Sequence, residues 1–95
     1  MADTKVKKRI RDFLRTEFVR AEDDRVIVRD GYADNVHVAI VSHRFDRLNP
    51  RERHGLIWDL LWKNLPKEVW GTITLAQDYT PREFVSMNGG PATRT

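Results

Sequence analysis

Three histidines, His37, His43 and His54, are the side chains of this 95-residue chain that can bind metals or move protons near neutral pH. His37 and His43 are six residues apart, across the end of an apolar segment, which matches no recognised metal-ligand spacing. Cysteine is absent, so thiol chemistry, disulfides and the usual ligands of iron–sulfur and structural zinc sites are excluded. The sequence therefore predicts no metal site of its own.

The motifs of common catalytic sites are also missing. There is no nucleophile between glycines in a strand-to-helix turn, no glycine-rich phosphate loop and no pair of carboxylates within apolar surroundings. We therefore expect a protein that is not an enzyme.

The pair Arg53-His54 falls in the first turn of a predicted helix, where cations oppose the helix macrodipole. Something other than helix stability should therefore favour this pair, and Trp70 is a candidate partner anchor, because Trp is enriched at binding hot spots. The structural alternative is that His54 packs under the sheet while Arg53 pairs with Asp46 or Asp59. Trp62 and Trp70 have the same two interpretations, partner anchor or core residue.

Basic residues on the predicted first helix and before the central helix form a second candidate site. The phosphate-binding candidates are Lys7, Lys8, Arg11, Arg47 and Arg51. The alternative is a solvated face whose long stems cover an apolar stripe. The Gly-x-x-Gly clamp of KH domains is absent, so we expect weak binding of nucleic acid without sequence preference.

Two elements must position these residues. Val36–Val41 alternates as a central strand with one fully apolar face. Asn49 and Glu52 have the spacing of a capping box, so a helix should begin at Pro50 and end near Asn64, before Pro66.

The remaining elements follow from similar local signals. The sequence predicts a basic amphipathic helix that is capped by Asp3 or Thr4 and extends to Phe18, a strand Arg25–Arg29, a strand Trp70–Ala76 and a short helix capped by Thr80. The first two strands should form an antiparallel hairpin. The order α-β-β-α-β-α predicts an α+β fold, a three-stranded sheet with helices on one face.

Length and composition set the organisation. We predict a single domain over residues 1–87 and a flexible tail over residues 88–95, which begins at a Gly-Gly-Pro segment. Net charge is only +3, and no apolar run approaches the about 20 residues of a membrane span. The basic N-terminus lacks an apolar stretch behind it, so we expect a cytoplasmic monomer without membrane association.

Several short motifs together resemble the BolA-like family. They are Val41-Ser42, Arg44-Phe45, Arg53-His54 eight residues after the Phe, and Tyr79-Thr80 with Glu83-Phe84. The resemblance covers most of the chain and implies an α+β fold related to class II KH domains. It also implies a regulatory or adaptor protein in iron or stress regulation, with nucleic-acid binding through the KH-like fold as the alternative.

Within that family, the resemblance implies a monothiol glutaredoxin partner and a shared [2Fe–2S] cluster. It also implies that Arg53 and His54 lie near the partner-binding surface, to which we add Trp70. The expected ligands are a histidine at the start of the last strand and a His or Cys in the hairpin loop. The matching positions hold Trp70 or Thr72 and Asn35, with His37 two residues beyond the loop position. We therefore expect docking to a glutaredoxin without cluster ligands from this chain.

Overall fold

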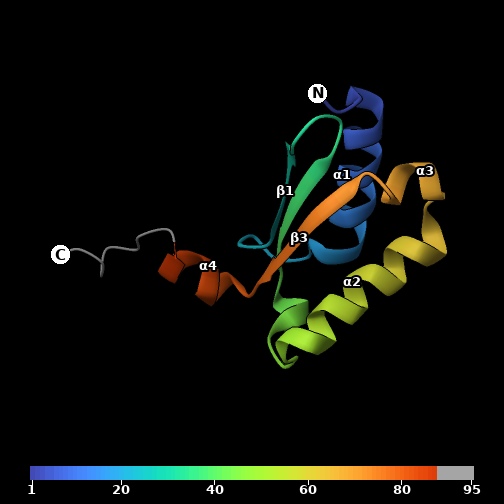
Figure 1. Cartoon of the computed structure of the whole chain (residues 1–95). Helices are drawn as coiled ribbons and strands as arrows, with labels where there is room; N and C mark the ends of the chain where they lie inside the picture. Colours follow the sequence, from blue (N-terminus) through green and yellow to red (C-terminus); the bar gives the residue numbers. More distant parts are fainter. Residues whose placement is uncertain (88–95) are drawn as a thin grey trace.

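A computed structural model describes residues 1–87, and within them a three-stranded mixed sheet and four α-helices form a compact α+β domain (Figure 1). The predicted tail over residues 88–95 lies outside the described residues. In chain order the elements are α1 (Thr4–Phe18), β1 (Arg25–Asp30), β2 (Val36–Val41), the 3₁₀ helix η1 (His43–Phe45), α2 (Pro50–Asn64), α3 (Lys67–Trp70), β3 (Ile73–Tyr79) and α4 (Pro81–Met87). None of these helices has the length and apolar character that a membrane span requires.

The sheet has the order β1-β2-β3, so the predicted central strand is confirmed. β1 and β2 pair antiparallel from Arg25 opposite Val41 to Asp30 opposite Val36, which confirms the predicted hairpin. β3 pairs parallel to β2, because α2 and α3 return the chain to the opposite end of the sheet before β3 begins.

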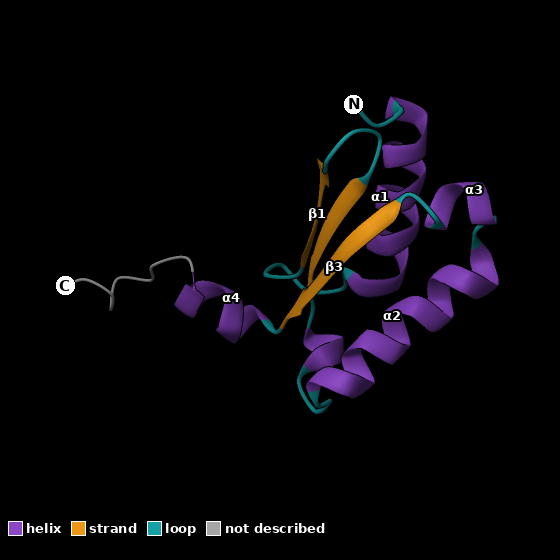
Figure 2. Cartoon of the chain, viewed as in Figure 1, coloured by secondary structure: helices purple, strands orange, loops and turns teal. Residues whose placement is uncertain are grey.

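The core lies between one sheet face and three helices. α1, α2 and α3 lie on the same side of the sheet, whereas α4 projects to the other side at the end of β3 (Figure 2). Helices on one face are thus confirmed for α1 to α3 and wrong for α4. Residues from β2, α1, η1 and α2 supply the fully buried side chains: Val36, Ile40, Ile10, Leu14, Phe18, Phe45, Ile57 and Leu61.

Local capping sets the helix ends as the sequence predicts. Asp3 caps α1 by accepting hydrogen bonds from the backbone N–H groups of Lys5 and Val6. The capping box of α2 is complete, because the Asn49 side chain accepts from Glu52 N at 2.8 Å and the Glu52 carboxylate accepts from Asn49 N at 2.9 Å. A second capping box, made by Thr80 and Glu83, begins α4.

The predicted third strand Trp70–Ala76 is wrong in its first residues, and the element order gains one helix. Residues Lys67–Trp70 form α3, because Pro66 ends α2 and also suits the entry to a new helical turn. Gly71 closes that turn by donating to Lys67 O at 2.8 Å. A Cβ atom at Gly71 would lie 2.6 Å from the same oxygen, so this close approach requires glycine.

Candidate functional site

Aromatic side chains form an exposed row on α2 and α3. His54, Trp58 and Trp62 follow one another at four-residue intervals, which places them on one face of α2. Trp70 comes from α3, and its ring centroid lies 5.7 Å from that of Trp62. We call these four residues the aromatic ridge. Every tryptophan of the chain belongs to it.

Trp58 and Trp70 anchor the ridge to the core, and Trp62 presents an exposed indole. Trp58 and Trp70 are half-buried and pack against the hydrophobic core, while the exposed ring of His54 lies 6.2 Å from that of Trp58. Trp62 is 67% exposed although its ring stacks at 34° on Trp70. A large apolar side chain that is held in place and open to solvent is typical of a contact surface.

An open pocket of about 280 Å³ lies along the ridge. It is lined by His54, Trp58, Asp59 and Trp62, all from the outer face of α2. The adjacent face of the helix carries Ile57 and Leu61, which are fully buried in the core. Because α2 is fixed by this inner face, the ridge and its pocket are presented on a rigid element.

Arg53, one of the three predicted partner-binding residues, is buried and has internal partners. It is 8% exposed, and its Nη1 lies 2.7 Å from a carboxylate oxygen of Glu83 in α4 and 3.8 Å from one of Asp78. Its Nε donates to Leu48 O at 2.9 Å. The expected pairing of Arg53 with Asp46 or Asp59 is wrong, because the partners come from β3 and α4.

The two carboxyl groups near Arg53 respond differently to their surroundings. The hydrogen bond from Arg53 holds the pKa of Glu83 below its usual value. Burial raises the pKa of Asp78 and outweighs the attraction of the more distant guanidinium. Arg53 thus ties α4 to the start of α2 chiefly through Glu83.

The other two predicted partner-binding residues belong to the ridge. His54 is exposed, so its predicted alternative of packing under the sheet is wrong. Trp70 is half-buried and serves as the support on which Trp62 stacks. The most exposed part of the ridge is therefore Trp62, which the repeated four-residue spacing of His54, Trp58 and Trp62 could have indicated.

The five predicted phosphate-binding residues divide into two groups. Lys7 pairs with Asp30 at 3.0 Å and Lys8 with Asp12 at 2.6 Å, while Arg11 is half-buried beside them on α1. Arg47 and Arg51 are exposed near the start of α2, which lies at the opposite end of the molecule from the N-terminus of α1 (Figure 1). The structure does not bring these residues together into one basic surface.

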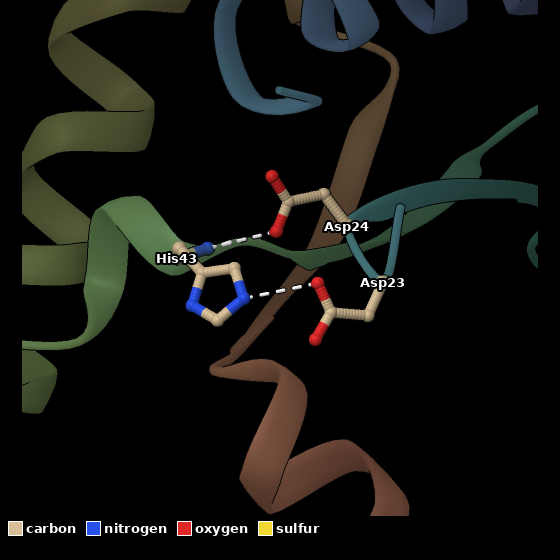
Figure 3. Close-up of side chains that lie close together, drawn as sticks. All are labelled: Asp23, Asp24 and His43. Carbon is tan, nitrogen blue, oxygen red and sulfur yellow. Dashed lines mark hydrogen bonds and ion pairs between the residues drawn. The ribbon is translucent and has the colours of Figure 1, made fainter. Parts of the chain in front are cut away.

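A second polar cluster, which the sequence analysis missed, surrounds His43 (Figure 3). Its Nε2 lies 2.9 Å from Asp23 Oδ1 and its Nδ1 lies 2.8 Å from Asp46 Oδ2. Its backbone N–H donates to the buried carboxylate of Asp24 at 2.9 Å. The ligand atoms of Asp23, Asp24 and His43 lie within 4.8 Å of one another.

The chemistry of this cluster is better suited to joining two chain segments than to binding a metal ion. Hydrogen bonds to Asp46 and Asp23 raise the pKa of His43, and these two carboxylates already engage both ring nitrogens. Burial opposes ionisation of Asp24, but backbone N–H donors from Arg20, Ala21 and His43 lower its pKa. These bonds join the α1–β1 loop to the end of β2.

The positions at which the family would place cluster ligands lie side by side but carry other chemistry. Val36, which follows Asn35, donates its backbone N–H to Thr72 O at 2.8 Å. The Thr72 hydroxyl donates to Val69 O within the α3 turn. The ring of His37 lies against Gly31, where an added Cβ would be 2.7 Å from the imidazole.

No protein-family model, curated protein or solved structure matches this chain. The similarity to the BolA-like family therefore remains a prediction from the motifs quoted above.

Proposed function

We propose that this protein is a non-enzymatic adaptor that docks a protein partner through the aromatic ridge. The observation that supports this proposal most is Trp62, an exposed indole held in place by stacking on Trp70. Rigid aromatic anchors carry much of the binding energy in protein interfaces and lose little conformational entropy on binding.

The first partner to test is a monothiol glutaredoxin, in a regulatory role in iron or stress responses. The motif resemblance supports this choice, and His54 of the resembling Arg53-His54 pair lies on the ridge. Since Asn35, Thr72 and Trp70 occupy the expected ligand positions, we propose docking that contributes no ligand to a [2Fe–2S] cluster.

Isothermal titration of the purified protein with apo monothiol glutaredoxin tests the proposal. Trp62→Ala should weaken binding by about 30-fold or more, as truncation of an interface hot spot costs ~2 kcal/mol. Because Trp62 is exposed, this variant should keep the unfolding temperature of the wild type. Val85→Ala, at an exposed apolar residue of α4, is the matched control and should bind normally.

Two outcomes would contradict the proposal. Equal affinity of the wild type and Trp62→Ala would remove the ridge as the docking surface. A new visible circular-dichroism spectrum with cluster-loaded glutaredoxin that disappears in His37→Ala would show that His37 is a cluster ligand, and docking without ligands would then be wrong.

The second candidate function is that of a nucleic-acid-binding module. The exposure of Trp62 favours it, because aromatic faces stack on unpaired bases, and Arg47 and Arg51 are exposed near the start of the same helix. We place it second because the N-terminus of α1 lies at the opposite end of the molecule from the start of α2 (Figure 1), and Lys7 and Lys8 are paired with acids.

A further inference from the structure

The pocket along the aromatic ridge combines two indoles with a carboxylate. Trp58 and Trp62 supply electron-rich ring faces, Asp59 supplies a negative charge, and His54 closes one end. Indole faces attract cations through the ring quadrupole, and a carboxylate adds direct Coulomb attraction. The chemistry of the lining therefore favours a cationic group.

The Asp59 carboxylate is available to a ligand. Within residues 1–87 it makes no hydrogen bond and no ion pair, although Lys63 lies one helical turn after it. By contrast, Lys8 and Asp12 in α1 have the same four-residue separation with the order reversed and are paired at 2.6 Å. The acceptor atoms of the Asp59 carboxylate are thus open to solvent beside the two indoles.

Gly55 leaves the approach to Asp59 open. It lies one helical turn before Asp59, inside α2, where glycine lowers helix stability relative to alanine. Apart from its two chain neighbours and the backbone of α2 itself, nothing lies within 4 Å of a Cβ built at this position, so packing within the described residues does not require glycine there. The missing side chain leaves a flat surface next to the pocket.

We propose that this pocket binds an arginine side chain of the docked partner, with the guanidinium against Trp58 and Trp62 and hydrogen-bonded to Asp59. The inference rests on the proposed docking function and adds the chemistry of the contact. Arginine fits better than lysine, because its planar guanidinium stacks on aromatic faces and forms paired hydrogen bonds to a carboxylate. The chain carries a net charge of +3, so attraction of a cation here must be local to the pocket.

The test uses the full chain and the indole N–H resonances of its three tryptophans in nuclear magnetic resonance spectra. The probe is the peptide acetyl-Gly-Arg-Gly-amide, and the matched control is its citrulline analogue, which has a similar shape without the charge. The arginine peptide should shift the resonances of Trp58 and Trp62 with millimolar affinity. The citrulline peptide should bind at least about fivefold more weakly.

Substitution of Asp59 tests the contribution of the carboxylate to peptide binding separately from that of the aromatic rings. Asp59→Asn keeps the size of the side chain and should weaken the arginine peptide about fivefold without changing the citrulline peptide. Glu22→Gln, which neutralises an exposed carboxylate of the α1–β1 loop, should change neither. Equal binding of the two peptides, no response of Trp58 and Trp62 to millimolar arginine peptide, or equal binding by Asp59→Asn would each overturn the inference.

The outcome is independent of the glutaredoxin experiment. If Trp62→Ala weakens glutaredoxin binding while the peptides do not bind, the docking function stands and the arginine pocket is wrong. If the arginine peptide binds as expected and glutaredoxin does not, the pocket stands and another partner that presents an arginine must be sought.

Discussion

His43 joins two loops through a ring held between two carboxylates. Hydrogen bonds to Asp46 and Asp23 raise its pKa above the ordinary value of 6.5. A cation whose pKa is higher in the folded state stabilises the fold fully below the unfolded pKa, and this contribution is lost as pH rises through the folded pKa. The carboxyl groups with lowered pKa values, such as Asp24 and Glu83, change the stability of the fold in a separate, acidic pH range.

We therefore predict that the free energy of unfolding falls as pH rises above about 6.5, and that His43→Gln reduces this fall. Urea denaturation at several pH values measures it. Asp46→Asn provides a second check, because removing the strongest partner should lower the pKa of His43 in a nuclear magnetic resonance titration. If His43→Gln left the pH dependence of the unfolding free energy unchanged, the contacts of His43 with Asp23 and Asp46 would not contribute to stability.

Substitution of Arg53 tests whether this residue stabilises the fold or binds a partner. Replacing it with Met keeps much of the volume but removes the donor to Leu48 O and leaves Glu83 with only the Thr80 N–H, which should cost about 2 to 3 kcal/mol of unfolding free energy. Thermal and chemical denaturation measure this change. If Arg53→Met retained full stability and instead abolished partner binding, the buried ion pair would not be the main role of Arg53.

At the scale of the element, the apolar surface of α2 extends beyond its buried stripe. Ile57 and Leu61 fill the core, Trp58 on the neighbouring row is half-buried against it, and Trp62 on the same row is exposed. An ordinary surface helix has one apolar stripe and a polar opposite face. The exposed end of the ridge at Trp62 is therefore the part of α2 that core packing explains least.

Substitutions on α2 test this division. Ile57→Ala and Leu61→Ala should each cost ~2 to 5 kcal/mol, as buried large-to-small changes do. Gly55→Ala should instead stabilise the protein by about 0.5 to 1 kcal/mol, because a Cβ there meets no neighbour and the helix gains propensity. Chemical denaturation distinguishes these signs. Near-neutral effects of both core substitutions would exclude α2 as the core helix.

For the whole molecule, charge is distributed in small balanced groups. The chain has 17 Lys and Arg residues against 14 Asp and Glu residues, and cations of α1 such as Lys7 and Lys8 are paired with acids. Exposed ion pairs of this kind add little to stability, but they lower the positive charge available to a polyanion.

We predict that single-stranded and duplex oligonucleotides bind weakly, without sequence preference, and are released at physiological salt, since counterion release would be the main source of affinity. Fluorescence anisotropy at low and physiological salt measures this. Arg47→Gln with Arg51→Gln should reduce binding at low salt more than Lys8→Gln, because Lys8 is already paired. Tight, sequence-specific binding at physiological salt would instead place nucleic-acid recognition ahead of protein docking.

Short-range signals in the sequence by themselves determined the starts of α1, α2 and α4 and the central strand. Asn49 and Glu52 are three residues apart, as are Thr80 and Glu83, so each capping box depends on neighbours along the chain. The alternation in Val36–Val41 likewise needs only adjacent residues. These features were predicted correctly because the interactions that produce them are local.

The tertiary structure decided which distant residues meet. Arg53 bonds to Glu83 across thirty residues, and His43 bonds to Asp23 across twenty. Trp62 stacks on Trp70 only because α3 forms after Pro66, where the sequence predicted a strand. Each contact depends on how the parallel strand β3 and the helices pack around β2, and no spacing along the chain encodes that arrangement.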